Sequence, residues 1–363
     1  PVNIEKAWHR FRRDRFEKSP RFIYRPLPVD PGLMKRDLYS IPIEKIEDPV
    51  LAGLFRQKQT ALDRELSMLR DRGSRAFLLQ SLQYFGDVEP ELKTLAVSLL
   101  EQVNPRSREK RRGGMINAHA FSMQAAEEMR KYALICPEID FRADIRDDIS
   151  GLMFSRGTLM IGKHLRIPAS RLEPLIQHEI GTHAVTYYNG RNQPFEQLYT
   201  GLAGYEELQE GLAVLAEYLT GGLSRPRLRV LAGRVAAAAS MTDGADFTET
   251  FRLLTRIYGF SRYTAYLITA RIYRGGGLTK DALYLKGLVN VLKYINEGRE
   301  LLPLFTGKIA QRHLPVIREL NFRKVLKKPP LKPAYLDKTD VQKRLQELRN
   351  AGSLTDIIQR RMI

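Results

Sequence analysis

The chain has 363 residues, of which 43% are hydrophobic and 28% charged, and its formal net charge is +18. This composition is typical of a globular protein with a sizeable core, and no apolar run approaches the roughly 18 residues that a membrane span requires. The single cysteine, Cys136, excludes an intrachain disulfide. Together with the lack of a signal segment after Pro1, it predicts a cytoplasmic protein without a membrane partner.

The positive charge is concentrated at residues 10–25, 106–112 and 323–332. Such an excess favours an acidic partner, either a polypeptide or a nucleic acid. No zinc-finger, RNA-recognition or helix-turn-helix signature accompanies these basic stretches, so nucleic acid is the weaker expectation.

The first half of the chain is expected to be mainly helical. Residues 1–30 mix basic, aromatic and proline residues and are predicted to form a basic N-terminal arm. Residues 31–112 form a helical N-terminal region, because leucines recur at helical spacing from Leu51 to Leu69 and from Leu92 to Leu100. The glycine-containing basic segment 104–115 is the predicted internal boundary.

Residues 113–330 are predicted to form the next domain, and the strand-like pattern is confined to 139–167. Gly157 marks a turn between alternating segments, and the stretch that begins at Thr158 is expected to be a strand. Ser170 and Glu173 then form a capping-box signature for a helix start. Helices are expected at 171–189, 205–220, 226–240, 246–258, 261–273, 280–297 and 307–320, followed by a C-terminal tail at 331–363. The predicted fold class is α+β, mostly α-helical, with a small sheet packed on the helix that follows Ser170.

The helix that follows Ser170 contains the sequence His178-Glu-Ile-Gly-Thr-His183. Neutral imidazoles are good zinc ligands, and a carboxylate beside them can act on water without occupying the metal. On a regular helix, a spacing of five residues turns the second ring about 140° away from the first. One π-bulge would absorb the extra residue, and Gly181 inside the interval favours it. The sequence therefore predicts His178 and His183 as metal ligands and Glu179 as the catalytic base.

A second helix offers a third ligand. Its leucines form one apolar stripe, whereas Glu206, Glu210 and Glu217 lie on another face beside small residues. Glu210 is the predicted metal ligand, with Gly211 and Ala213 leaving room beside it, and Glu207 is the alternative. Glu206 and Glu217 are predicted to orient the histidines. The predicted cofactor is Zn²⁺.

The two motifs, His178 to His183 and Gln209-Glu-Gly-Leu-Ala213, resemble those of the bacterial QEGLA-motif proteins described as flavohaemoglobin expression-modulating. These are related to the microtubule-associated tyrosine carboxypeptidases, which remove the C-terminal tyrosine of α-tubulin. Further similarity lies at Tyr273-Arg-Gly-Gly, at residues 278–281 and at Tyr284-Leu-x-Gly287. The resemblance implies that residues 113–330 form a zincin-like metallopeptidase domain with a carboxypeptidase-like activity on acidic polypeptide tails. It also implies that residues 158–165 form an edge strand that lines the cleft.

A carboxypeptidase must also bind the free carboxylate of its substrate and stabilise an oxyanion. Arginine or lysine serves the first purpose and a tyrosine hydroxyl the second. The predicted substrate-binding residues surround the Gly275-Gly-Gly277 turn and are Arg271, Tyr273, Arg274, Lys280 and Tyr284, with Tyr205 as a further oxyanion donor.

Two other classes of function remain open on the sequence. A regulatory or binding protein with a catalytically weak zinc site would keep its role when Glu179 is changed to glutamine. A nucleic-acid-associated basic protein would show steep salt dependence of binding.

Overall fold

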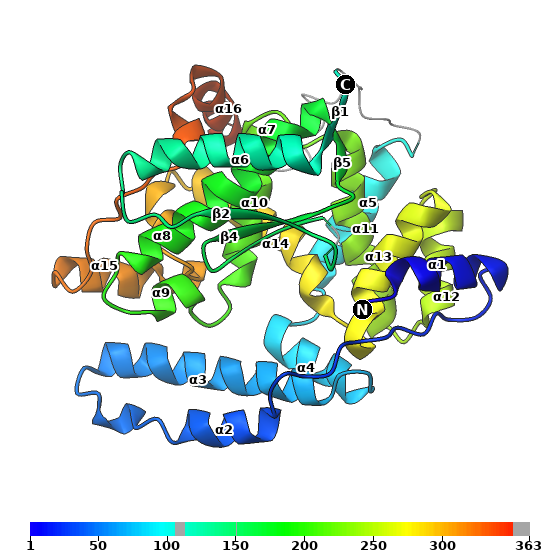
Figure 1. Ribbon diagram of the computed structural model, residues 1–363, viewed down its shortest axis with the longest axis horizontal. Coiled ribbons are helices and arrows are strands. Elements are labelled where there is room, and N and C mark those ends of the chain that lie inside the picture. The colour runs from blue at the N-terminus through cyan, green and yellow to red at the C-terminus, as the bar shows by residue number, and fades with distance from the viewer. Residues whose placement is uncertain (106–112, 150, 351–363) are drawn as a thin grey trace. The chain divides into compact units, whose positions relative to one another are not determined.

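The computed structural model describes residues 1–105, 113–149 and 151–350, so the basic run predicted at 106–112 lies outside the described residues. Helices predominate and the strands are few, which confirms the predicted mostly helical α+β class (Figure 1). None of the helices in these ranges combines the length and the apolar composition that crossing a membrane requires. The cytoplasmic location stays a prediction.

The chain divides into two compact units that interleave along the sequence. The first unit comprises residues 1–108 and 225–285, and the second comprises 109–224 and 286–363. This division differs from the consecutive segments 1–30, 31–112, 113–330 and 331–363 expected from the sequence. The reason is that residues 225–285 pack on the N-terminal helices, a long-range contact that composition along the chain does not reveal.

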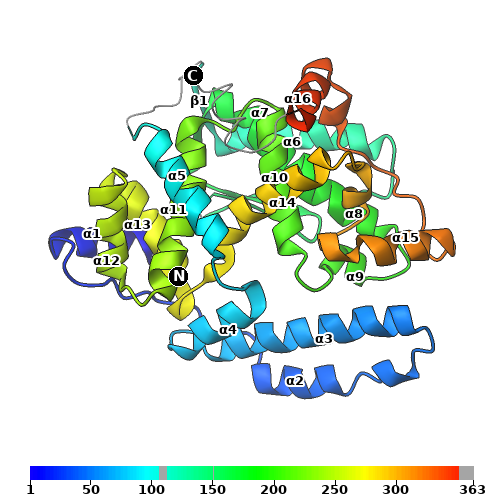
Figure 2. The ribbon, with the colours of Figure 1, turned by 180° about the vertical axis from the view of Figure 1, so that it is seen from behind.

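The first unit is helical. Its α-helices are α1 (Ile4–Arg13), α2 (Pro31–Tyr39), α3 (Pro49–Arg70), α4 (Ala76–Phe85), α5 (Pro90–Gln102), α11 (Arg225–Thr242), α12 (Phe247–Arg252) and α13 (Arg262–Tyr273), and α14 (Leu283–Asn296) begins in it. Figure 2 shows α5 lying along α11. There the buried Arg229 donates a hydrogen bond of 2.6 Å to the carbonyl oxygen of Leu100. This contact ties the two segments of the unit together.

Residues 1–30 are more than an arm on the surface. Their first part forms α1, whose Trp8 and Phe11 are buried against rings of α12 and α13. Phe11 lies 4.9 Å from Phe251, and Trp8 lies 5.0 Å from Tyr266, centroid to centroid. The basic residues of α1 mark its exposed face, whereas its apolar face is part of the core.

The second unit contains the sheets and the motif helices. Its strands are β1 (Met115–Asn117), β2 (Arg142–Arg146), β3 (Leu152–Ser155), β4 (Thr158–Gly162) and β5 (Arg166–Pro168). Its further helices are α6 (Ala118–Ala133), α7 (Leu172–His178), α8 (Val185–Arg191), α9 (Gln197–Thr200), α10 (Glu206–Leu219), α15 (Leu314–Phe322) and α16 (Thr339–Arg349), with most of α14. Residues 351–363, the end of the C-terminal tail predicted at 331–363, lie outside the described residues.

The three-stranded sheet corrects one expectation. Its order is β2-β4-β3, so β4 is the central strand, parallel to β2 and antiparallel to β3. The segment that begins at Thr158 is therefore not an edge strand, and β3 occupies that edge instead. The hairpin turn at Gly157 folds β3 back onto β4 and leaves β3 with one partner strand.

The start of the motif helix also differs from the prediction. Ser170 lies inside a short 3₁₀ turn, Ala169–Arg171, and α7 begins at Leu172 without a side-chain cap. The backbone N–H of Ala169 donates to the carbonyl oxygen of Gly114, next to the antiparallel pair β1 and β5. This bond connects the N-terminal end of α7 to the strand pair. The predicted capping box of Ser170 and Glu173 is not formed.

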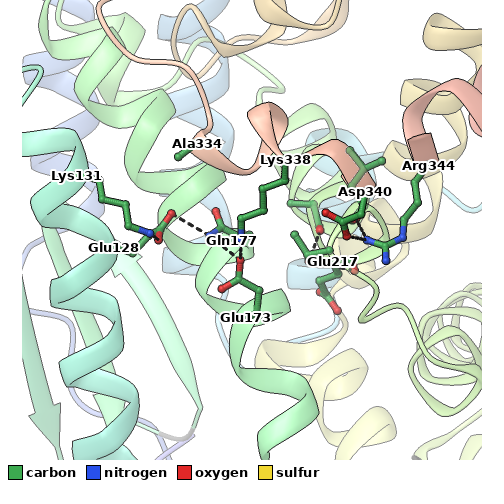
Figure 3. Close-up of polar contacts among 12 residues, drawn as sticks. Glu128, Lys131, Glu173, Gln177, Glu217, Ala334, Lys338, Asp340 and Arg344 are labelled. Atoms are coloured by element: carbon green, nitrogen blue, oxygen red, sulfur yellow. Dashed lines mark hydrogen bonds and ion pairs between the residues drawn. The ribbon is translucent and has the colours of Figure 1, made fainter. Parts of the chain in front are cut away.

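The C-terminal part of the second unit lies over α7 (Figure 3). Lys338 forms an ion pair of 2.6 Å with Glu173, and Arg344 of α16 donates to the carbonyl oxygen of Leu219 at the end of α10. On the other side of α7, Gln177 donates to Glu128 of α6 at 2.9 Å. The helix that precedes the motif is thus packed between α6 and the C-terminal segment.

Candidate metal centre

The interval between the two motif histidines is a π-helical turn, Glu179–Ala184, between α7 and α8. This confirms the predicted π-bulge. A π turn contains one more residue than an α turn, which returns His183 to the side of the helix that carries His178. The two imidazole centroids lie 5.1 Å apart, at an interplanar angle of 76°.

Glu210 of α10 completes a group of three potential ligands. One atom from each of His178, His183 and Glu210 lies within 4.8 Å of the other two. Glu210 Oε2 is buried and has no hydrogen-bond partner among the described residues, and it lies 3.9 Å from His183 Nε2. A buried carboxylate oxygen without a donor is unfavourable unless a cation balances it.

His178 is held by a buried carboxylate. Its Nδ1 lies 2.9 Å from Glu217 Oε1, and the other oxygen of Glu217 accepts a hydrogen bond of 2.8 Å from Arg171. Burial lowers the pKa of His178, but the bond to Glu217 and the neighbouring carboxylates outweigh burial, so the net shift is upward. Because Nδ1 faces Glu217, Nε2 is the nitrogen that remains for a metal.

His183 is oriented by polar groups of α8 and α10. Its Nδ1 lies 3.5 Å from Gln209 Oε1, which also accepts a hydrogen bond of 2.8 Å from Thr186. Burial is the main cause that lowers the pKa of His183 to about 4, so the ring is neutral at pH 7. Neutral imidazole is the form that binds metal ions.

Glu179 follows the first histidine and is only 6% exposed. Burial raises the pKa of its carboxyl group to about 7, and the Phe154 backbone N–H of β3 opposes this shift through a hydrogen bond. The edge strand β3 therefore contacts Glu179, which the sequence predicts as the catalytic base. Its Phe154 ring also lies 5.6 Å from the ring of Tyr187 in α8.

The position of α10 depends on two glycines. A methyl group at Gly211 would lie 2.3 Å from the carbonyl carbon of Gly287, and one at Gly287 would lie 2.0 Å from the carbonyl oxygen of Glu207. The backbones of α10 and α14 therefore cross in direct contact. Gly211 serves this crossing rather than only leaving room beside Glu210.

The other glutamates of α10 have different surroundings. Glu207, the alternative ligand on the sequence, accepts a hydrogen bond of 2.6 Å from Asn290 and forms an ion pair of 3.3 Å with Lys286. These contacts direct it to α14 and away from the histidines. Glu206 is buried in the first turn of α10, and its predicted role in orienting a histidine stays a prediction.

A lysine that the sequence reading missed lies close to this group. Lys308 Nζ lies 5.6 Å from the ring centroid of Tyr187 and 5.8 Å from that of Tyr205. Its charge is among the causes that lower the pKa of His183, after burial. No local motif marks Lys308, because it approaches the site through a chain return about one hundred residues after α10. Gln209, Thr186 and Arg171 were missed for a related reason, since only tertiary contacts reveal their partners.

The residues predicted to bind substrate lie in the first unit and have partners there. The buried Asp281 accepts hydrogen bonds from Arg271, including one of 2.9 Å, and it lies 3.9 Å from Arg274 and 3.7 Å from Arg234. Burial raises the pKa of Asp281, but the three guanidinium groups outweigh it, so its net shift is downward.

The two predicted tyrosines of this set also have contacts within the first unit. The Tyr273 hydroxyl donates to the carbonyl oxygen of Asp246 at 2.9 Å, and the ring of Tyr284 lies under Arg234. Lys280 is half-buried in a 3₁₀ turn, Thr279–Ala282. A role of these residues in substrate binding stays a prediction.

Two neutral or neutralisable imidazoles, one carboxylate ligand and an adjacent buried carboxylate form the arrangement found in metal-dependent peptidases. The comparison of the chain with protein families supports a peptidase. The chain belongs to the microtubule-associated tyrosine carboxypeptidase family, whose family model matches residues 9–353. No curated protein matches the chain. The resemblance expected from the two motifs is thus confirmed.

Proposed function

We propose that this chain is a zinc-dependent carboxypeptidase that removes a C-terminal residue from polypeptides with acidic tails. The observation that carries the proposal is the convergence of His178, His183 and Glu210 within 4.8 Å, next to the buried Glu179. Membership of a tyrosine carboxypeptidase family supports a terminal tyrosine as the residue removed. The formal charge of +18 supports an acidic substrate.

The residues fit zinc. Two imidazole nitrogens and one carboxylate oxygen form a common ligand set of catalytic zinc sites, which keep a further position open. The buried Glu210 Oε2, without a hydrogen-bond partner among the described residues, is the atom that a cation would satisfy. His178, His183 and Glu210 would hold the ion, and a zincin-like site is part of this proposal.

The side chains divide the chemistry between them. The chemistry that zinc supplies when bound is Lewis acidity, which acidifies water and polarises a peptide carbonyl. Glu179 takes the proton from the attacking water and delivers it to the leaving amine as the peptide bond breaks. Glu217 and Gln209 fix the imidazoles of His178 and His183, respectively, so that neither ring must reorient during the reaction.

An exopeptidase must also recognise the free carboxylate of its substrate. Lys308 supplies a cation in the same unit as the three ligands, beside Tyr187 and Tyr205. An ammonium group binds a carboxylate as a point charge. We therefore include Lys308 in the proposal as the group that binds the terminal carboxylate, and Arg271 and Arg274 as the alternative that the sequence suggests.

The test combines metal analysis with a peptide panel. Wild-type protein is expected to contain one zinc ion per chain and to release single residues from acidic peptides, with preference for a terminal tyrosine. Glu179→Gln should keep the zinc and lose about 10²- to 10⁴-fold in turnover. Glu196→Gln, which changes an exposed glutamate of the same unit, is the matched control.

Three outcomes would contradict parts of the proposal. Wild-type protein that binds no zinc would contradict the metal centre, and internal cleavage would indicate an endopeptidase. Lys308→Gln should raise KM for peptides that end in a free carboxylate, without changing the slow cleavage of the matching C-terminal amides. An equal effect on acids and amides would exclude Lys308 as the carboxylate-binding group.

A further inference from the structure

We infer that Tyr335 is a positioning residue for the metal centre, because its ring supports the π-helical turn that brings His183 to the side of His178. The inference rests on the proposed function, since the spacing of the histidines matters only if they bind a metal. Tyr335 lies more than 150 residues after the motif, and the sequence reading placed it in a C-terminal tail.

The ring of Tyr335 contacts the middle of the π turn. Tyr335 is fully buried, in a short 3₁₀ turn, Ala334–Asp337. A methyl group added at Gly181 would lie 2.3 Å from Gln177 Oε1 and 3.0 Å from both Cδ1 and Cε1 of this ring. Gly181 therefore has no side chain at the point where the ring packs on the backbone between the two histidines.

A π turn needs such support because it is less stable than an α turn of the same residues. If the turn relaxed to α geometry, each residue would advance about 100°, and His183 would point away from His178. The aromatic ring offers a rigid apolar surface whose dispersion contacts with Gly181 exist only while the backbone keeps its present course. Loss of the ring would therefore favour the geometry in which the ligands separate.

The segment that carries Tyr335 is bound by side-chain amides of α8 and of the residues that follow it. Asn189 donates to the carbonyl oxygen of Leu331 at 2.9 Å and accepts from the backbone N–H of Leu331 at 2.9 Å. Gln193 forms the same pair of bonds with the backbone of Lys327, each of 2.9 Å. Each amide thus bonds both the N–H and the carbonyl oxygen of one residue, as the backbone of a neighbouring β-strand does.

Contacts on either side of Tyr335 hold the ring in place. The backbone N–H of Ala334 donates to the Tyr132 hydroxyl at 2.8 Å, and Lys338 pairs with Glu173 of α7. Figure 3 shows Ala334 and Lys338 on the same side of α7, with Gln177 of α7 between Lys338 and Glu128. The segment on either side of Tyr335 is thus bound to α7 through Lys338 and to α8 through Leu331.

An ordinary core residue would stabilise the fold without a specific effect on the ligands. The two roles differ in the zinc affinity of the folded protein. If Tyr335 positions the turn, its truncation weakens zinc binding even where the far-UV circular dichroism spectrum and the melting transition show that the chain is folded.

The experiment measures the zinc dissociation constant by chelator competition for Tyr335→Phe, Tyr335→Leu and Tyr335→Ala. Phenylalanine keeps the ring and should bind zinc within about twofold of wild type. Alanine should weaken binding by about tenfold or more, as loss of an outer support of a zinc ligand does. Leucine, which retains most of the apolar volume and guards against unfolding, should lie between them. The cobalt-substituted leucine variant should show an altered visible absorption band.

Tyr294→Ala is the matched control. Tyr294 is equally buried in the same unit, where its hydroxyl donates to the carbonyl oxygen of Glu300. Its truncation should lower stability without changing the zinc affinity of the folded fraction. Equal zinc affinity of wild type and Tyr335→Leu, or an equal loss in Tyr294→Ala, would overturn the inference. Absence of zinc binding by wild-type protein would instead overturn the proposed function.

Discussion

Glu217 is a fully buried carboxylate with two charged or chargeable partners. It lies between the guanidinium of Arg171 and the Nδ1 of His178. A histidine that ligates a metal usually donates its other ring nitrogen to such a group, which fixes the tautomer and raises the basicity of the ligand. Glu217 thus connects His178 of the candidate metal centre to the guanidinium of Arg171.

We expect Glu217→Gln to weaken zinc binding by about 10- to 100-fold, because the neutral amide fixes the imidazole less strongly. Chelator competition at pH 7 measures this change. Glu207→Gln, on the same helix, is the matched control, since Glu207 pairs with Asn290 and Lys286. A loss of affinity in Glu207→Gln alone would indicate that Glu207 is the ligand.

His313 makes stability depend on pH. It is 3% exposed, and its Nδ1 accepts a hydrogen bond of 3.2 Å from the backbone N–H of Ala310, which requires an unprotonated nitrogen. Burial, followed by the charge of Arg312, lowers the pKa of His313 to about 4. The unfolded chain has a histidine pKa of about 6.5, so between these values the unfolded state binds more protons than the folded state.

Stability contributed by neutral His313 is therefore present above pH 6.5 and is lost as the pH falls towards 4. The loss in the free energy of unfolding should reach about 3 kcal/mol once the pH is below the folded-state pKa of His313. His313→Asn keeps an acceptor for Ala310 but does not titrate, so its free energy of unfolding should fall less between pH 7 and pH 4.5. Urea unfolding at both pH values measures the free energy of unfolding. An equal fall in this free energy for wild type and His313→Asn would show that His313 does not cause the pH dependence.

At the scale of elements, the position of Glu210 in the candidate metal centre depends on how closely α10 approaches α14. Gly211 and Gly287 allow backbone contact at the crossing, one residue from Glu210. Any side chain at either glycine would push the helices apart and move Glu210. Gly211, the glycine of the Glu-Gly-x-Ala pattern, is therefore needed for the packing of α10 against α14 and not for α10 alone.

We expect Gly211→Ala to lower the free energy of unfolding by about 1–3 kcal/mol, because the added methyl group would overlap the Gly287 backbone. Chemical denaturation measures this loss. Gly53→Ala in α3 is the control, since a methyl group there would meet no atom within 4 Å. This change should raise stability by up to about 1 kcal/mol, as alanine favours a helix over glycine. If Gly211→Ala left the free energy of unfolding unchanged, α10 and α14 would be able to move apart without loss of stability.

A comparison of predicted and observed helix boundaries shows where the local apolar pattern was sufficient to predict a helix. The predicted helices at 205–220, 226–240 and 261–273 match α10, α11 and α13 closely, because their apolar periodicity is long and uninterrupted. The predicted helix at 307–320 begins only at Leu314, after a 3₁₀ turn, Gln311–His313. The backbone of Lys308 instead donates to the carbonyl oxygen of Leu198 in α9 and accepts from the N–H of Leu202 after α9. Tertiary pairing overrode the helical pattern there.

For the whole molecule, the dominant property is the formal charge of +18. A charge of this size attracts acidic polypeptides over distances comparable to the Debye length, which is about 10 Å in 0.1 M salt. Association with an acidic tail should therefore be faster at low ionic strength, whereas cleavage of the bound peptide should not depend on salt.

We expect kcat/KM for an acidic peptide to fall by roughly tenfold between 50 and 300 mM NaCl, with kcat unchanged. A peptide with the same terminal residue and a neutral tail provides the control and should change by less than about twofold. Steady-state kinetics over this salt range measures both. The same salt dependence for both peptides would show that the net charge does not select the substrate.

The sequence by itself determined the helical class, the family and the histidine pair with its π turn, because each depends on residues close together in the chain. The five-residue spacing of His178 and His183 can bring both rings to one side only through such a turn. The tertiary structure decided the interleaving of the two units, the place of β3 at the sheet edge and the contacts of Glu217, Lys308 and Tyr335. Those features depend on packing between segments tens to hundreds of residues apart, and no local pattern records which distant side chain fills a given space.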